Sequence, residues 1–496
     1  MDAAIDWRAE AQRITFRDKA FIGGAFVPSL GGKTFDCISP IDGRVLARVA
    51  ACGPEDVDAA VRSARAVFES GAWADQAPRV RKRVLIRFAD LIVKHANELA
   101  LLETLDMGKP IANARNADLR GVAECVRWYG EAIDKLYDEI APTGKSALAL
   151  ITREPLGVVA AVVPWNFPLM MAAWKFAPVL AAGNSLVLKP AEQSPLSALR
   201  VAELALEAGI PPGVFNVVPG FGETAGQALG RHADVDAITF TGSTEVGKLF
   251  LKYSGESNMK AVSLECGGKT PNIVFADAPD LDAAAADAAD GIFYNSGQVC
   301  DAGSRLLVEE KIHDRFLDSV KRHAAKYQPG DPLDQNTKMG AMVDETQTKR
   351  VLGYIAKGKE EGAALALGGK QVRKDTGGFY IEPTIFDRVD NKMTIAREEI
   401  FGPVLSTITF KTMEEALKLA NESSYGLEAN LFTNDLTKAH KMARALKAGV
   451  VTINTRDIGG IEVPFGGYKQ SGFGRDRSLH ALEKYTQLKS TYINVG

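Results

Sequence analysis

The pattern of hydrophobic and polar positions alternates between strand-like and helix-like segments from residue 156 onward. The apolar run GVVAAVVPW is typical of a buried strand, PLMMAAWKFAPVLAAG of a helix that ends near Gly183, and SLVLKP of a second strand. These three segments predict a βαβ unit. The pattern continues through the predicted strands VFNVVPG and VDAITFTG to a helix at STEVGKLFLKY. Parallel strands joined by helices predict a doubly wound α/β sheet that is covered on both faces.

The chain changes character near Thr270. After the strand segments AVSLE and NIVF, the Asp- and Ala-rich run DAPDLDAAAADAAD predicts a helix, and RLLVEE begins a second α/β series. The segments APTGKSALALITREP and KYTQLKSTYINV are typical of exposed strands, which often add to the sheet of another subunit. We therefore predict a first domain of residues 1–140 and 155–270, a second of 271–470, and an oligomerisation arm of 141–154 and 471–496. We expect a homodimer or a homotetramer.

Composition narrows the classes of function. A chain of 496 residues exceeds what one hydrophobic core usually supports, which agrees with more than one domain. The chain has 59 Lys and Arg residues and 62 Asp and Glu residues, a net charge of −3. It therefore lacks the excess of positive charge that would predict binding to nucleic acid or anionic lipid. The most apolar region, residues 156–188, is interrupted by prolines, asparagines and a lysine, which favours a globular core over a membrane span.

The five cysteines are scattered and form no CxxC pair. They predict neither a disulfide framework nor a zinc site, and they fit a reducing compartment. The polar, acidic start of the chain does not have the pattern of a signal peptide. We therefore expect a cytoplasmic protein without a structural metal.

Two glycine-containing segments follow predicted strands. GSTEVGKL, from Gly242, has the spacing of a phosphate loop, but Leu249 occupies the position where Ser or Thr must hold magnesium, which excludes an NTPase. A helix start after a strand can still receive a phosphate, with Ser243 as an added donor, although an ordinary helix cap explains the segment equally well. PGFGETAG, which contains Gly222, has the spacing GxGxxxG and is weak evidence for a dinucleotide.

Lys189 and Glu192 lie just past the end of a predicted parallel strand, where ligands of open α/β sheets bind. A solvated surface pair is the ordinary interpretation. Both side chains can also hydrogen-bond the hydroxyls of a nucleotide ribose, and the carboxylate would repel a 2′-phosphate. On this interpretation the sequence predicts NAD, with NADP possible.

Cys300 stands among small and polar residues in FYNSGQVCDAGSR. Most free cysteines are buried and unreactive, so burial is the ordinary interpretation. Two features favour a reactive thiol instead. Gly297 and Gly303 leave room for a ligand, and Gln298 and Arg305 are unlikely packing residues.

Asn166, in PWNFP, and Glu265, in SLECGGK, both follow predicted strands of the first domain. A nucleophilic thiolate, an amide donor and a carboxylate are together what acyl chemistry at a carbonyl requires. The sequence therefore predicts that these two residues converge on Cys300 from the other domain.

With these motifs the chain resembles the NAD(P)-dependent aldehyde dehydrogenases over nearly its whole length. The matching segments, in order, are PWNFP at 164–168, KPAE at 189–192, FTGSTEVG at 240–247, ECGGK at 265–269, GQVC at 297–300, EEIFGPV at 398–404 and PFGGYKQSGFGR at 464–475. Any one segment is weak evidence, but seven in the same order are highly specific.

The resemblance implies a reaction and the residues that carry it. Cys300 would be the nucleophile, Asn166 and the Cys300 amide the oxyanion hole, and Glu265 the general base. An aldehyde would be oxidised to the acid through a thiohemiacetal and a thioester on Cys300. The implied cofactor residues are Trp165, Lys189, Glu192, Gly222, Gly242, Ser243, Glu399 and Phe401.

The resemblance also suggests a substrate class. The C-terminal run SLHALEKYTQLKSTYINV is similar to that of γ-glutamyl-γ-aminobutyraldehyde and guanidinobutyraldehyde dehydrogenases. Asp301 disfavours a neighbouring thiolate unless it points into the substrate channel and meets a cation. Asp118 matches an acidic position that faces the entrance in aminoaldehyde-oxidising relatives. We therefore expect an aldehyde with an ω-amino, guanidino or amide-capped tail, against apolar walls formed by Met170, Trp174 and Phe465.

Other functions remain open at this point. In a CoA-acylating semialdehyde dehydrogenase a thiol resolves the thioester, and Glu265 argues against that chemistry. A broad-specificity enzyme for aliphatic or aromatic aldehydes is a further alternative. A catalytically silent binding protein would not need Cys300, Asn166 and Glu265 together.

Overall fold

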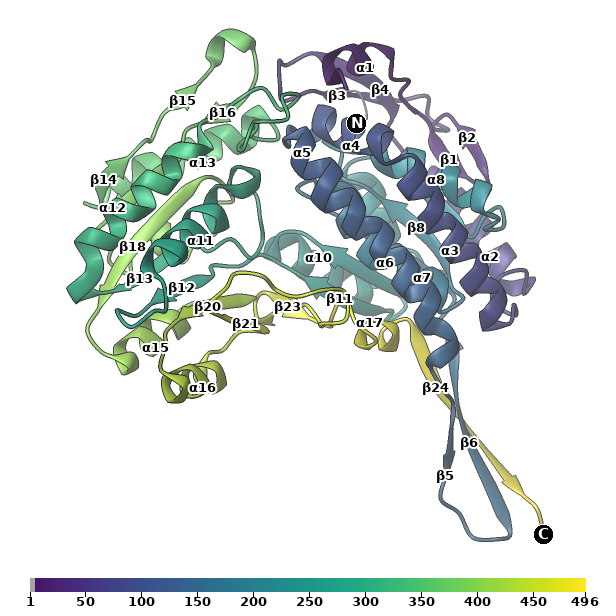
Figure 1. Ribbon diagram of the computed structural model, residues 1–496. Helices are drawn as coiled ribbons and strands as arrows, with labels where there is room; N and C mark the ends of the chain where they lie inside the picture. The colour runs from purple at the N-terminus through teal and green to yellow at the C-terminus, as the bar shows by residue number, and fades with distance from the viewer. Residues whose placement is uncertain (1–4) are drawn as a thin grey trace.

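The computed structural model describes residues 5–496 and contains two lobes, each built around its own sheet, with a thin arm that projects from one of them (Figure 1). None of the helices within this range combines the length and the apolar character that crossing a bilayer requires. Each of the five cysteines is a free thiol.

The first lobe contains an eight-stranded sheet in the order β2-β1-β9-β8-β7-β10-β11-β23. Its five central strands are parallel and almost wholly buried, because the apolar runs of the sequence face helices on both sides. The doubly wound sheet predicted from the sequence is confirmed. The strands are β1 (Ala20–Ile22), β2 (Ala25–Val27), β7 (Val158–Val162), β8 (Ser185–Lys189), β9 (Phe215–Val217), β10 (Ala237–Thr241), β11 (Ala261–Glu265) and β23 (Gly472–Phe473).

Helices cover both faces of this sheet (Figure 1). Buried carboxylates of α4 cap two of them: Leu169 N, in the first turn of α7, donates to Glu103 Oε1 at 2.7 Å, and Leu196 N, at the start of α8, donates to Asp106 Oδ2 at 3.2 Å. Both helices follow loops with predicted site residues, so α4 helps to fix those loops. The helices of this lobe include α2 (Pro54–Glu69), α3 (Pro78–Lys94), α4 (Ala96–Met107), α6 (Leu119–Ala132), α7 (Pro168–Ala181), α8 (Leu196–Ala208) and α10 (Thr244–Gly255).

The second lobe contains a seven-stranded sheet in the order β14-β17-β18-β13-β12-β20-β21, in which only the edge strand β14 is antiparallel. Its strands are β12 (Pro271–Val274), β13 (Arg305–Glu309), β14 (Ala364–Leu367), β17 (Thr384–Asp387), β18 (Val404–Phe410), β20 (Glu428–Phe432) and β21 (Val450–Ile453). Its main helices are α11 (Leu281–Phe293), α12 (His313–Ala324), α13 (Glu345–Glu360), α15 (Met413–Asn421) and α16 (Leu436–Ala445).

The arm is a three-stranded sheet in the order β24-β6-β5, formed by β5 (Glu139–Ala141), β6 (Ala147–Pro155) and β24 (Thr486–Asn494). Strand β24 pairs with β6 along nine positions. Within the segment 471–496, β23 instead pairs with β11 of the first sheet, and α17 (His480–Glu483) packs near α7. The arm therefore draws only on the last part of that segment.

Candidate active site

The predicted site residues of the first lobe lie at one edge of its sheet. Asn166 follows β7, Lys189 ends β8, Ser243 lies two residues after β10, and Glu265 ends β11. Because these strands are parallel neighbours, their carboxyl ends meet at a common edge, which is where open α/β sheets bind their ligands.

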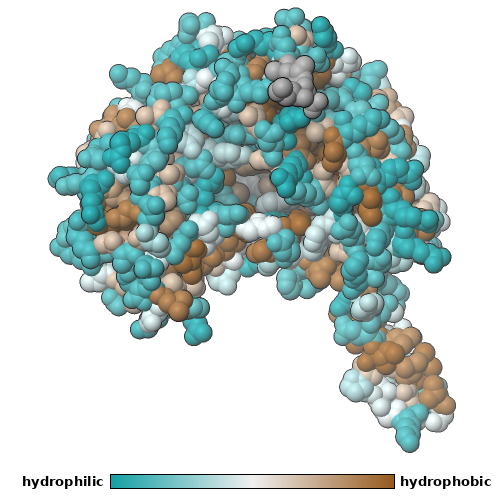
Figure 2. All heavy atoms as spheres, in the orientation of Figure 1, coloured by the Kyte–Doolittle hydropathy of each residue, from teal (hydrophilic) through white to brown (hydrophobic). Residues whose placement is uncertain are grey.

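Cys300, Asn166 and Glu265 line a single pocket of about 160 Å³ between the lobes. The hollow between the lobes is visible on the face shown in Figure 2. Cys300 is partly exposed, whereas the other four cysteines are buried. The structure thus brings together the three residues that the sequence predicted to converge.

The loop before Cys300 has a strained backbone. Asn295 and Ser296 both have positive φ, 49° and 56°, a conformation that non-glycine residues rarely adopt. Asn295 Nδ2 donates to the backbone oxygen of Asn166 at 2.9 Å, so the loop is attached directly to the first lobe. This hydrogen bond sets Cys300 opposite the edge of the first sheet.

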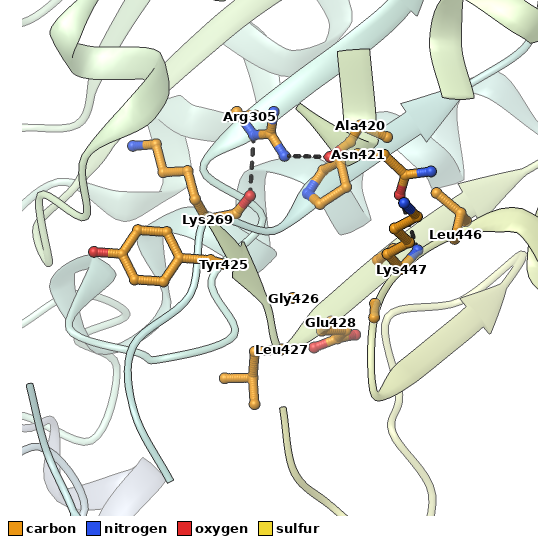
Figure 3. A pocket seen from close by; sticks show the side chains of 13 residues that line it. Lys269, Arg305, Ala420, Asn421, Tyr425, Gly426, Leu427, Glu428, Leu446 and Lys447 are labelled. Carbon is orange, nitrogen blue, oxygen red and sulfur yellow. Dashed lines mark hydrogen bonds between the residues drawn. The ribbon is translucent and has the colours of Figure 1, made fainter. Parts of the chain in front are cut away.

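Gln298 and Arg305 are structural residues, contrary to the expectation that they would not pack. Gln298 is completely buried, and its Oε1 accepts from Val343 N at 2.9 Å. Arg305 is equally buried and donates to the backbone oxygens of Lys269 and Ala420, both at 3.0 Å (Figure 3). Their long polar side chains satisfy buried backbone acceptors, which sequence patterns do not reveal.

Burial dominates the electrostatics of Cys300 and Glu265. The pKa of Cys300 is raised well above its usual range, first by desolvation and then by the nearby Asp301 carboxylate. The pKa of Glu265 is also raised, by desolvation and Asp476, against the opposing charge of Lys175. Neither oxygen of Glu265 has a hydrogen-bond partner among the described residues. The pocket therefore holds a thiol next to an unpartnered carboxyl group.

Two glycines make room on the floor of this pocket. A Cβ on Gly267 would collide with the Glu399 carboxylate, and one on Gly268 would collide with the backbone oxygen of Cys300. Instead, Gly268 N donates to Glu399 Oε1 at 3.2 Å. The pKa of Glu399 is raised to about 7 by burial. Only glycine fits where the two lobes approach this closely.

Most of the predicted cofactor residues line the same pocket. Trp165 and Phe401 pack edge to face with ring centroids 5.2 Å apart, and Phe401 has a φ of 59°. Ser243 caps α10 by accepting from Val246 N at 3.2 Å. The pocket is lined by Trp165, Gly242, Ser243, Glu399 and Phe401 together with Thr241, Gln347 and Arg350, which the sequence analysis did not select.

Lys189, Glu192 and Gly222 lie further along the same sheet edge, outside the pocket that contains Cys300. Lys189 Nζ is buried, 3.4 Å from Glu192 Oε2, and its side chain passes close to Gly226. Gly222 begins the helical turn Gly222–Gly226 that follows β9. A nucleotide could extend from the pocket to this pair.

The residues present fit a dinucleotide. The helix start at Ser243 can receive a phosphate, the Thr241 hydroxyl is buried without a partner among residues 5–496, and the absence of a side chain at Gly267 lets the Glu399 carboxylate lie against the backbone of the pocket. Glu399 and the Lys189–Glu192 pair supply groups that can hydrogen-bond ribose hydroxyls. These groups lie at the sheet edge where nucleotides bind in this class of fold.

The apolar substrate wall forms beside Cys300 and includes Trp174 of α7. The rings of Trp174 and Phe465 are tilted by 59° with centroids 5.3 Å apart, and they pack with Leu427, Ile458 and Cys300. Met170 instead packs into the core of the first lobe, close to Gly121 of α6. Helix α7 therefore directs only one of the two predicted wall residues toward the thiol.

Asp118 is not a free carboxylate at an entrance, which corrects the sequence-based expectation. It is 2% exposed and forms an ion pair with the buried Lys109. Lys109 Nζ also lies 3.6 Å from the centre of the Phe167 ring, next to Asn166. A buried pair of this kind is neutralised internally and cannot attract a substrate from solvent.

Asp301 does line an open chamber, of about 550 Å³, next to the thiol. The chamber walls carry five carboxylates, those of Asp287, Asp290, Asp301, Glu428 and Asp457, and one arginine, Arg456. Arg456 is paired with Asp290. The chamber is therefore strongly acidic.

Glu428 is one of the chamber residues that the sequence analysis missed. It begins β20 and is 4% exposed, and the Asn430 amide donates to its Oε1. Figure 3 shows it from a neighbouring pocket, near Leu427 and Gly426. The signal was present in the sequence, because EANLF places a carboxylate and an amide in an otherwise apolar strand. A charge in a buried strand is rare without a function or a partner.

Comparison with known proteins agrees with this site. The model of the aldehyde dehydrogenase family matches residues 26–491, and the chain belongs to that family. It is an NAD(P)-dependent enzyme that oxidises aldehydes to acids.

Three relatives illustrate the similarity. The chain is 53% identical over 489 residues to the NADP/NAD-dependent aldehyde dehydrogenase PuuC of Escherichia coli K12, covering 99% of this chain and 98% of that one. It superposes with a TM-score of 0.98 on the γ-glutamyl-γ-aminobutyraldehyde dehydrogenase of Burkholderia cenocepacia, at 57% identity and 99% coverage of both chains. The TM-score is also 0.98 for the P. syringae indole-3-acetaldehyde dehydrogenase AldA in complex with NAD+ and IAA, at 59% identity and 99% coverage of both.

Proposed function

We propose that the substrates are aldehydes whose far end carries a positive charge, such as an ω-amino or guanidino group. The observation that supports this is the acidic chamber beside Cys300, where five carboxylates face a single arginine. A cationic tail would bring the opposite charge to these carboxylates, whereas a neutral tail would leave them without a partner. Relatives named for γ-glutamylamino and amino aldehydes agree with this assignment.

In the proposed reaction, Cys300 attacks the aldehyde carbon to form a thiohemiacetal. Because the pKa of the resting thiol is raised, its proton must leave before attack, and Glu265 in the same pocket is the candidate acceptor. The Asn166 amide and the Cys300 backbone amide would stabilise the developing oxyanion. Bound NAD, held by Glu399, Ser243 and the Lys189–Glu192 pair, supplies the hydride acceptor.

Glu265 would then activate the water that hydrolyses the thioester on Cys300. A carboxyl group with a raised pKa and no partner within the described residues is suited to accept a proton from water. The acid leaves and the free thiol returns. A carboxylate at this position favours water over a CoA thiol as the acceptor of the acyl group.

A neutral aromatic aldehyde is the second candidate substrate. Trp174 and Phe465 pack together as an apolar wall against Cys300, and one relative is named for indole-3-acetaldehyde. This wall explains how an aldehyde head could be held, but it provides no partner for the five carboxylates. The cationic class therefore accounts for more of the chamber.

We also propose that the arm joins subunits in a homodimer or homotetramer. Strand β24 has β6 on one side only among the described strands, and it exposes Leu488, Tyr492 and Ile493. Figure 2 shows hydrophobic side chains gathered on the projecting arm. An exposed apolar edge strand is stabilised by pairing with another chain.

The free thiols fit a reducing compartment, and we therefore propose that the enzyme is cytoplasmic. Cell fractionation would test this location.

Replacing Asn166 by Ala should lower turnover by about 100-fold or more, because one oxyanion donor contributes roughly 2.7 to 4 kcal/mol in comparable sites. The measurement is kcat for NADH formation at saturating aldehyde. The melting temperature should be recorded in parallel, since Asn166 Nδ2 also donates to Gln298 O at 2.9 Å. Turnover at the wild-type level would remove Asn166 from the mechanism.

Replacing Glu265 by Gln should abolish steady-state NADH formation, because water is no longer activated to hydrolyse the thioester, and a surviving single burst of NADH would restrict its role to that step. Loss of the burst as well would assign its main role to deprotonation of Cys300. Stopped-flow fluorescence of NADH separates the two results. A steady state equal to that of the wild type would exclude both roles.

Replacing Asp301 by Asn should reduce the preference for a cationic aldehyde. We expect the ratio of kcat/KM for 4-guanidinobutanal to kcat/KM for hexanal to fall about tenfold or more, since hydrogen bonds to charged groups contribute roughly 1.5–3 kcal/mol. Asp314→Asn, whose side chain is 99% exposed on α12, is the matched control and should leave the ratio unchanged. A wild-type ratio near one would reject the proposed substrate class.

Replacing both Leu488 and Tyr492 by Lys should dissociate the assembly. These side chains lie on one face of β24, four residues apart, and charges there would oppose burial against another subunit. Light scattering coupled to size-exclusion chromatography would measure the mass, with the conservative Ser490→Thr on the same strand as control. An unchanged mass in the double variant would show that the arm does not hold the subunits together.

A further inference from the structure

The side chains of Asp301 and Glu428 both line the wall of the acidic chamber. Each carboxyl group shifts the pKa of the other through a side-chain hydrogen bond. A hydrogen bond between two carboxyl groups requires a proton on one of them, because an ionised carboxylate can only accept. A pair of this kind holds one proton and one negative charge.

The surroundings explain why this proton is retained. Glu428 is 4% exposed, and Asn430 donates to its Oε1 without supplying charge. Burial raises the pKa of both groups, and the charge of Asp301 raises the pKa of Glu428 further, whereas Arg456 acts to lower both. Removing the proton from two adjacent carboxyl groups is unfavourable without a compensating cation, so the pair retains it to a higher pH than a single carboxyl group would.

The positively charged groups near the pair do not fully compensate a second negative charge on it. Arg456 is the nearest positive group, but it forms an ion pair with Asp290. Arg477 contributes from the segment before α17, at longer range. The other titratable groups carry no positive charge in either protonation state. They are Asp287, Asp290, Tyr294 and Asp457 in the chamber and Cys300, Glu265 and Glu399 toward the thiol.

We propose that Asp301 and Glu428 share one proton in the free enzyme and release it to solvent when the cationic tail of the substrate binds. The proposal rests on the proposed substrate class and adds a mechanism of selection to it. Before binding, the pair carries one negative charge and one proton. After binding, it carries two negative charges, one of them matched by the substrate cation, and one proton has left.

Proton release gives selectivity a pH dependence with a defined sign. At low pH the cation must displace a proton, so its apparent affinity rises with pH, by about tenfold per unit for one proton released. Above the pKa of the pair in the free enzyme the proton is already absent, and the affinity becomes constant. A neutral aldehyde displaces no proton and lacks this dependence.

The test is the ratio of kcat/KM for 4-guanidinobutanal to kcat/KM for hexanal, measured between pH 6 and 9. The guanidinium remains charged over this range, and titration of Cys300 and Glu265 affects both substrates, so it cancels in the ratio. We expect the ratio to increase with pH and then to level off. A ratio above one that does not change with pH would overturn the proton linkage and leave the substrate class intact, whereas a ratio near one throughout would reject the substrate class itself.

Glu428→Gln supplies the matched variant, because it keeps the hydrogen-bonding shape and cannot hold the second negative charge. Its ratio should lose the pH dependence, and its melting temperature and NAD binding would show that it is folded. Glu310→Gln, at the far end of β13 from the Asp301 loop, should retain the wild-type profile. A pH dependence that persists in Glu428→Gln would assign the titration to another group.

A binding measurement on the wild-type enzyme is independent of turnover and of any variant. Butylguanidinium has the cationic tail and no aldehyde. Calorimetry in two buffers of different ionisation enthalpy should show up to one proton released per molecule bound at neutral pH, and less at pH 9. Binding without proton release would contradict the proposal.

Discussion

The site depends on the attachment of one strained loop to the opposite lobe. Asn295 and Ser296 adopt a left-handed backbone, and the Asn295 side chain donates to the backbone oxygen of Asn166. The cost of such a conformation, roughly 1–3 kcal/mol for each residue, is offset by the surrounding hydrogen bonds. Together with the hydrogen bond from Asn166 Nδ2 to Gln298 O, this contact fixes the separation between a thiol from one lobe and an amide from the other, which an oxyanion hole requires.

The pattern of the sequence predicted the parts of this arrangement that depend on periodicity. The apolar runs of β7, β8, β10 and β11 identified a parallel sheet, and the residues at their carboxyl ends followed from that topology. The roles assigned to Cys300, Asn166 and Glu265 required the resemblance to a family, because residue types and spacing alone left a buried cysteine as the ordinary interpretation. Their convergence on one pocket depends on contacts distant in sequence, which only the structure provides.

The misplaced residues share a physical cause. Asp118, Gln298 and Arg305 are long or charged side chains that the fold buries with internal partners. A sequence shows that such a residue is polar but not whether its partner is solvent, substrate or backbone. Glu428 was overlooked for the opposite reason, since it lies in an apolar strand and the candidate residues were sought after strands and in loops. Charged residues within buried strands merit the same attention as those in loops.

The thiol lies between two spaces whose walls share no residue. The pocket with Glu399 and Phe401 opens on one side of Cys300, and the acidic chamber with Asp301 and Arg456 opens on the other. Nucleotide and acid therefore need not pass each other when they depart.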